Sequence, residues 1–142
     1  MKYLAIVGLI GLIFFVSNGL SQDPDCPVYK LMMASVEKCK GQLSEENAKL
    51  MEKNPGVEND EINCFRGCVL VGMGVMKNAK IDIENLKELM KQSKSPTTAE
   101  AVVTVARECK KQSEVSNNEC EVAGSYTKCV VALKDKAEKA GA

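Results

Sequence analysis

The sequence predicts an all-helical domain of about six helices joined by disulfides. Apolar residues recur at helical spacing along the chain from residue 26 onward, and no two-residue alternation persists, so no strand is expected. The chain also contains seven cysteines in 142 residues. Cys64 and Cys68 lie about 40° apart on one helix and face nearly the same way, so we expect each to bridge to a different segment.

Residues 1–21 have the pattern of a secretory signal peptide. A lysine is followed by an almost unbroken apolar run over residues 4–16 and by small residues before a cut ahead of Gln22. The alternative is a membrane anchor, but the apolar run is shorter than the ~20 residues of a span. We therefore expect residues 22–142 to form one secreted, extracellular domain that is not inserted in a membrane after cleavage.

The expected mature chain has little net charge and no histidine. Its 18 basic and 19 acidic residues give a formal charge of −1, and no long basic run favours nucleic acid or an anionic membrane as a partner. Without histidine, the Ser-His, Cys-His and His-Asp catalytic arrangements are excluded. No Gly-rich phosphate loop or paired-aspartate motif occurs. We predict that the protein is not an enzyme and has no catalytic residue and no cofactor.

Capping residues predict the first two helices. Asp25 and Pro27 suit the start of a helix over residues 26–40, because a carboxylate caps the first N–H groups and proline fits the first turn. Ser44 is expected to cap a shorter second helix. The run Asn54-Pro55-Gly56 is expected to end it.

The third helix is predicted to begin near Asp60 and to be apolar on two sides. One stripe comprises Ile62, Phe65, Val69, Met73 and Met76, and the other comprises Cys64, Cys68, Val71 and Val75. Such a helix is normally surrounded by other helices. Gly67, Gly72 and Gly74 each weaken it by up to ~1 kcal/mol relative to alanine. They are either tolerated small residues or points where a neighbouring helix or a ligand comes close.

Three more helices are predicted in the second half of the chain. Asp82 caps a short fourth helix, Thr97 to Glu100 has the form of a capping box that opens the fifth, and the sixth starts near Asn118. Their expected inward-facing residues are Ile83, Leu86 and Met90, then Val102, Val105, Ala106 and Cys109, then Val122, Tyr126, Cys129, Val130 and Leu133. Residues 134–142 are polar and charged.

Spacing alone does not settle how the cysteines pair. Six cysteines allow 15 pairings, and seven with one left free allow 105. Cys120 and Cys129 lie about 180° apart on one helix and so face different partners. A metal site at Cys64 and Cys68 is not expected, because the chain has no histidine and thiolate-only zinc sites usually use closer cysteine pairs.

The cysteine spacing resembles a known signature. Cys39-x24-Cys64-x3-Cys68-x40-Cys109-x10-Cys120-x8-Cys129 is similar to the six-cysteine pattern of insect odorant-binding proteins, the pheromone and general-odorant-binding family. The resemblance implies a compact bundle around an apolar cavity, held by three interlocked disulfides, Cys39–Cys68, Cys64–Cys120 and Cys109–Cys129. It also implies a soluble carrier that transports small hydrophobic molecules such as odorants or pheromones through extracellular fluid, for example sensory lymph, with an olfactory receptor as a further partner.

Helical faces place ten candidate ligand-binding residues on the implied cavity. They are Val69, Met73, Met76, Leu86, Met90, Val102, Val105, Tyr126, Val130 and Leu133. Methionines are flexible and polarisable, so they either fill a core or line an adaptable pocket. The phenol of Tyr126 both donates and accepts hydrogen bonds. It either orients a ligand's hydroxyl or carbonyl, or reaches solvent or a backbone carbonyl.

Three further expectations concern association, ligand release and an alternative function. Cys26 departs from the family pattern and forms either an intermolecular Cys26–Cys26 disulfide in a homodimer or a free thiol. Without histidine, ligand affinity is expected to change little between about pH 7.5 and 5.5. The alternative function is a secreted venom, salivary or reproductive-fluid protein on the same scaffold that acts through protein interaction.

Overall fold

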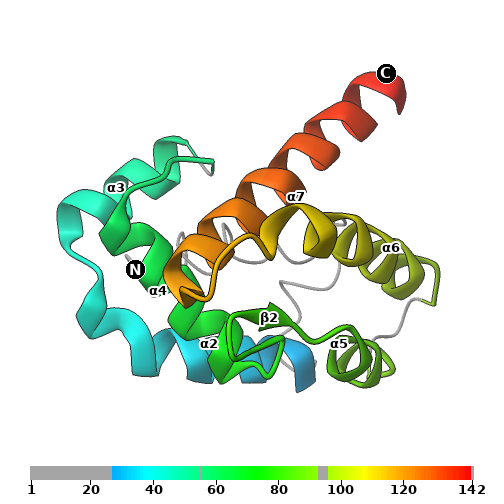
Figure 1. Ribbon diagram of the computed structural model, residues 1–142, viewed down its shortest axis with the longest axis horizontal. Helices are drawn as coiled ribbons and strands as arrows, with labels where there is room; N and C mark the ends of the chain where they lie inside the picture. The colour runs from blue at the N-terminus through cyan, green and yellow to red at the C-terminus, as the bar shows by residue number, and fades with distance from the viewer. Residues whose placement is uncertain (1–26, 55, 93–95, 142) are drawn as a thin grey trace.

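The computed structural model describes residues 27–54, 56–92 and 96–141 (Figure 1). The expected signal peptide and Cys26 lie outside these ranges. The described residues form six α-helices, one short 3-10 helix (η1) and a two-stranded sheet. In order, they are α2 (Pro27–Cys39), η1 (Lys40–Gln42), α3 (Glu45–Lys53), α4 (Asp60–Gly72), β1 (Met76–Lys77), β2 (Lys80–Ile81), α5 (Ile83–Met90), α6 (Pro96–Ser113) and α7 (Glu119–Gly141). The prediction of an all-helical bundle is confirmed.

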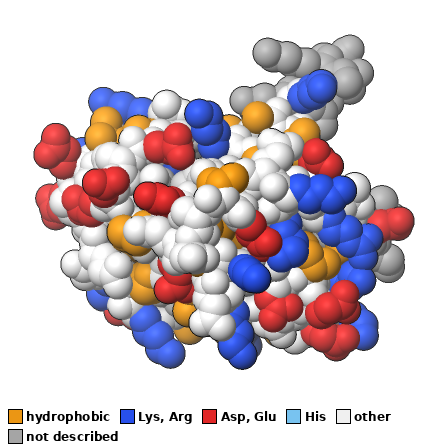
Figure 2. All heavy atoms as spheres, viewed as in Figure 1, with side chains coloured by type: hydrophobic (Ala, Val, Ile, Leu, Met, Phe, Trp, Pro, Cys, Tyr) orange, Lys and Arg blue, Asp and Glu red, His pale blue; other side chains and the backbone are white. Residues whose placement is uncertain are grey.

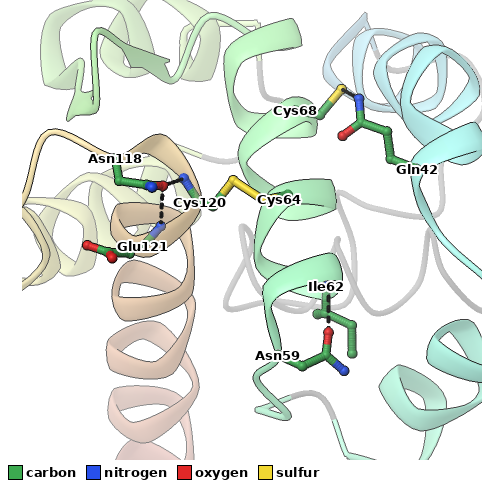
Figure 3. Close-up of a disulfide and its surroundings, with 8 residues drawn as sticks. All are labelled: Gln42, Asn59, Ile62, Cys64, Cys68, Asn118, Cys120 and Glu121. Atoms are coloured by element: carbon green, nitrogen blue, oxygen red, sulfur yellow. Dashed lines mark hydrogen bonds between the residues drawn. A yellow bond between two sulfur atoms is a disulfide. The ribbon is translucent and has the colours of Figure 1, made fainter.

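Side-chain caps start four of these helices. Ser44 and Asp82 cap α3 and α5, as predicted, and Asn118, near which the sixth helix was expected to start, caps α7. In each case a side-chain oxygen accepts a hydrogen bond from a backbone N–H two or three residues later, at 2.8–3.2 Å. Asn59, which the sequence reading did not single out, caps α4 in the same way, accepting from the N–H of Ile62 at 2.8 Å (Figure 3).

The helix α4 ends earlier than predicted. The apolar pattern indicated a helix that reaches Met76, but α4 stops at Gly72. Gly74 follows with a φ of +76°, a conformation that glycine adopts without strain. The second predicted stripe is wrong at Val71, which is 44% exposed, although Val75 is buried beyond the end of the helix.

A short hairpin replaces the end of the predicted helix. The strands β1 and β2 are antiparallel, with Met76 opposite Ile81. The expectation that the chain has no strand is therefore wrong here. Asn78 and Ala79 form the turn with φ values of 54° and 61°, which resembles the type I′ turns of two-residue hairpins. The usual signal for such a turn is Asn-Gly or Asp-Gly, and Asn-Ala lacks it.

The helices α4 and α7 form the centre of the bundle. The pairs that pack most extensively are α4 with α7, α6 with α7, and α2 with α4. Three disulfides join the same three pairs, and their pairing is the one that the resemblance implied. They are Cys39–Cys68 between α2 and α4, Cys64–Cys120 between α4 and α7, and Cys109–Cys129 between α6 and α7. On the chain-entropy model, each contributes up to ~3–4 kcal/mol, and the contributions do not add.

The two cysteines of α4, one turn apart, bridge to different neighbouring elements. Figure 3 shows Cys64 directed toward Cys120 at the start of α7, and Cys68 directed toward Gln42. The side-chain nitrogen of Gln42 lies 3.5 Å from the Cys68 sulfur. The helix α4 is therefore fixed to the elements on both sides of it.

Two glycines of α4 mark close approaches of neighbouring helices. A Cβ at Gly67 would lie 3.2 Å from the carbonyl oxygen of Glu119 on α7, and one at Gly72 would lie 2.9 Å from the hydroxyl of Ser35 on α2. Close packing, and not mere tolerance of small residues, therefore accounts for both positions.

The C-terminal part of α7 projects away from the other helices (Figure 1). The helix continues through the polar segment that begins at residue 134 and ends at Gly141. None of the helices in the described ranges is both long enough and apolar enough to cross a bilayer.

Candidate functional site

The ten predicted ligand-binding residues come together in one apolar region. Eight of them are buried members of the main apolar cluster: Val69, Met73, Met76, Leu86, Met90, Val102, Tyr126 and Val130. Val105 and Leu133 are partly buried and pack against the same cluster. The site therefore draws on α4, the hairpin, α5, α6 and α7. Met76 belongs to it from β1 and not, as predicted, from a helix.

The cluster is larger than the predicted set. The helix α2 adds Val28, Met32 and Val36, α3 adds Met51, and β2 adds Ile81. The helical spacing of the α2 residues was visible in the sequence, so this contribution could have been predicted. Nothing in the pattern marked Ile81, because its place depends on the hairpin.

Methionine is unusually prominent in this core. Five methionines are buried: Met32, Met51, Met73, Met76 and Met90. Their unbranched thioether side chains have three rotatable bonds and fill irregular spaces better than branched aliphatic side chains do. A core of this composition can rearrange around an apolar guest with little strain.

Tyr126 places a phenol inside the apolar cluster. It is only 3% exposed, and its hydroxyl forms no hydrogen bond with another residue of the described ranges. Burial raises the pKa of this phenol well above its usual value, so the hydroxyl stays neutral and can both donate and accept. A phenol at this position can form a hydrogen bond with a polar group of a ligand that packs against the cluster.

Arg66 is a second buried polar residue, and its contacts are structural. Its guanidinium donates to the backbone carbonyl of Val57 at 2.7 Å and approaches the amide oxygen of Asn63 at 3.4 Å. Burial lowers the pKa of Arg66 to about 10, opposed by the nearby carboxylate of Glu58, so the side chain keeps its charge at neutral pH. It fixes the segment before α4 to α4 itself. The sequence reading missed this residue.

A surface cleft of about 450 Å³ lies between α5 and α6. Its lining comprises Lys87, Met90, Lys91, Ala99, Glu100, Val103, Thr104 and Arg107. Figure 2 shows hydrophobic side chains at the surface over this part of the molecule, with basic side chains beside them. Of the ten predicted residues, Met90 alone lines this cleft, so its side chain borders both the apolar cluster and the surface.

The described residues contain no group of three or more cysteine or acidic side chains placed to hold a metal ion. The six cysteines of the signature are all paired in disulfides. What the site presents chemically is an apolar, methionine-rich interior with one phenol.

Comparison with known proteins agrees with this arrangement. The model of the PBP/GOBP family matches residues 27–132, a segment that contains all six bridged cysteines. A solved structure, the odorant-binding protein dmelOBP28a from Drosophila melanogaster, is similar with a TM-score of 0.61 and 24% sequence identity. The similarity covers 77% of this chain and 93% of that one, and at this identity it shows a shared fold. No curated protein sequence matches the chain.

Proposed function

Because the chain belongs to the PBP/GOBP family of insect odorant-binding proteins, we propose that it is a secreted carrier of small hydrophobic molecules. It binds odorants, pheromones or similar compounds in its helical core and transports them through aqueous extracellular fluid. An olfactory receptor is the proposed recipient. The proposed ligand-binding residues are the ten that were predicted from the sequence, now grouped around one apolar cluster.

The observation that best supports this function is the position of Tyr126. Its side chain is only 3% exposed and belongs to the apolar cluster, so its phenol is placed beside the residues that would contact an apolar ligand. A ligand with an apolar chain and one hydroxyl or carbonyl group would satisfy the phenol and pack against the methionines. Medium-chain alcohols, aldehydes and esters have this chemistry.

The disulfide framework suits such a carrier. A core that rearranges to admit a guest gives up part of its own packing, which ordinarily destabilises a small domain. Here crosslinks join the three helix pairs with the most extensive packing. They limit the entropy of the unfolded chain and so compensate for imperfect packing inside the folded one.

A displacement assay tests the carrier function. The chain has no tryptophan, so an environment-sensitive fluorescent probe should be bound first and then displaced by decan-1-ol, decanal and decane. We expect Tyr126→Phe to weaken the binding of the alcohol and of the aldehyde about fivefold to tenfold, because one hydrogen bond is lost. The affinity for decane should be unchanged. Tyr29→Phe on α2 is the matched control, because Tyr29 only packs against the edge of the cluster. If the probe is not taken up and no compound displaces it, the carrier function is wrong.

Secretion can be tested separately. Expression in insect cells should release the protein into the medium with Gln22 as its first residue, because the signal peptide is cut before it. Retention in the membrane fraction with residues 1–21 intact would support an anchor instead.

A further inference from the structure

The cleft between α5 and α6 combines an apolar floor with a charged rim. Met90 from α5 and Ala99 and Val103 from α6 provide the apolar part of its lining. The charged part consists of three cations, Lys87, Lys91 and Arg107, and one carboxylate, Glu100. The lining therefore has an excess of two positive charges, although the chain as a whole is formally neutral.

Arg107 is the cation that is most available to a ligand. Lys87 pairs with Glu84 at 3.2 Å and Lys91 with Glu88 at 2.7 Å. Both are exposed ion pairs between residues one turn apart on a helix. Such pairs contribute little to stability, so either lysine can leave its partner for a ligand. Arg107 forms no ion pair with any residue in the described part of the chain. Its planar guanidinium can bind a carboxylate with two parallel hydrogen bonds.

We propose that this cleft is a second binding site, for a single-chain amphiphile with an anionic headgroup such as a medium- or long-chain carboxylate. Arg107 binds the headgroup, with Lys87 nearby, and the alkyl chain lies against Met90 and Val103. The volume of about 450 Å³ lies within the range of roughly 300–1,000 Å³ that small-molecule sites occupy.

The charge of the cleft favours a free amphiphile over an anionic membrane. Clusters that bind anionic membranes typically contain about 4–8 basic residues. The cleft has three, and a carboxylate lies among them. A concave site with an apolar floor also suits one alkyl chain better than a flat bilayer surface.

This site is distinct from the proposed carrier site and does not depend on it. Arg107 and Lys87 lie outside the apolar cluster, whereas Tyr126 is buried within it. Met90 is common to both, so a chain in the cleft contacts a side chain that also belongs to the interior. Ligands with the same chain and different headgroups can therefore separate the two sites.

The test compares decanoate with decan-1-ol by titration calorimetry below their aggregation concentrations. We expect Arg107→Ala to weaken the binding of decanoate about tenfold and to leave the affinity for decan-1-ol unchanged, because only the anion loses a charge-assisted hydrogen bond. Tyr126→Phe should have the opposite selectivity. Lys49→Ala, which removes an exposed cation from α3, is the matched control and should change the affinity for neither ligand. Equal affinity of wild type and Arg107→Ala for decanoate would overturn the proposal.

The position of the ligand can be checked by NMR of labelled valine methyl groups. Decanoate should shift the signals of Val103, in the cleft, more than those of Val69, in the interior set. Shifts at Val69 alone would place the anion in the interior and overturn the second site. Sedimentation with vesicles containing anionic phospholipid should show no binding. Vesicle binding that requires Arg107, without binding of decanoate, would instead identify a membrane surface.

Discussion

Gly67 of α4 lies directly against the backbone of Glu119 at the start of α7. A Cβ at Gly67 would lie 3.2 Å from the Glu119 carbonyl oxygen, closer than most side chains tolerate. This part of α7 has little freedom to withdraw, because the next residue, Cys120, is tied to Cys64 on α4. The crossing of the two central helices therefore depends on the absence of a side chain at Gly67.

We predict that Gly67→Ala lowers the free energy of unfolding by about 1 kcal/mol. The added methyl group overpacks the crossing at a typical cost of about 1–3 kcal/mol, which exceeds the gain of up to ~1 kcal/mol in helix propensity. Urea unfolding of the oxidised protein measures this change. Gly41→Ala is the control, because no atom lies within 4 Å of a Cβ built there. A Gly67→Ala protein more stable than wild type would show that α7 can shift.

The hairpin is fixed to α6 by two side chains that both reach Ile81. The Lys110 ammonium donates to the Ile81 carbonyl at 2.8 Å, and the Ile81 N–H donates to the Glu114 carboxylate at 2.9 Å. Lys110 and Glu114 also pair with each other one turn apart on α6. The short hairpin, which has little pairing of its own, thereby gains charge-assisted hydrogen bonds.

Removal of this contact should loosen the hairpin. We predict that Glu114→Ala destabilises the protein by about 1–2 kcal/mol, because the Ile81 N–H and Lys110 both lose a charged acceptor. Amide hydrogen exchange at Ile81 should accelerate more than exchange in α4. Glu108→Ala, which alters an exposed carboxylate on the same helix, should leave exchange at Ile81 unchanged. Unchanged protection of Ile81 in Glu114→Ala would mean that strand pairing alone holds the hairpin.

Local signals predicted much of this fold. Ser44 and Asp82 each specify a helix start through one side-chain oxygen that accepts a hydrogen bond from a nearby N–H, so these predictions needed only neighbouring residues. The end of α4 could not be predicted in this way. Val75 and Met76 are buried in the structure, and they would also be buried if α4 continued as a helix. Their apolar character therefore does not distinguish a helix from a hairpin.

The candidate site was likewise predictable only in part. Helical spacing placed Tyr126 on an inward face, but only the packed structure shows that its side chain is almost fully buried within the apolar cluster. The α5–α6 cleft was not predicted at all. Its character depends on the juxtaposition of Met90 and Arg107 from two helices, and each sequence segment alone reads as an ordinary amphipathic helix.

Glu61 should make part of the stability dependent on acid pH. Its carboxylate accepts from the backbone N–H of Ser44 and from the side-chain amide of Asn47 at 2.6 Å, joining α4 to the start of α3. The bond from the Ser44 backbone is the main cause that holds the pKa of Glu61 below its ordinary value of 4.5. A lowered pKa contributes stability above the unfolded-state pKa, and this is lost as pH falls through the folded-state pKa.

We therefore predict that the melting temperature falls as pH is lowered below about 4.5, and that this fall is smaller in Glu61→Gln. At pH 7, Glu61→Gln should be less stable than wild type. Glu46→Gln, an exposed change on α3, is the control and should retain the wild-type pH dependence. If the melting temperatures of Glu61→Gln and wild type fall equally across this pH range, the proposed role of Glu61 is contradicted.

Cys26 remains the cysteine without a place in the framework. The six signature cysteines are all bridged to one another, so an intermolecular disulfide through Cys26 needs no exchange with them. We predict a band of twice the monomer mass on a non-reducing gel of secreted protein, absent after reduction and absent in Cys26→Ser. A monomer band under both conditions would show that Cys26 is a free thiol.

Binding of a neutral ligand should change little between about pH 7.5 and 5.5. The chain has no histidine, and among the described residues the pKa values that depart clearly from their usual values move away from this interval or stay above it. The pKa of Glu61 is lowered, that of Lys91 is raised from 10.5 mainly by its hydrogen bond to Glu88, and burial raises that of Tyr126. The Tyr126 phenol thus stays protonated at both pH values and presents the same donor and acceptor to decan-1-ol. Probe displacement by decan-1-ol at the two pH values measures the effect, with decane as the control for changes in the apolar core. If the affinity for the alcohol falls more than about threefold while that for decane does not, a carboxylate near the site titrates in this range.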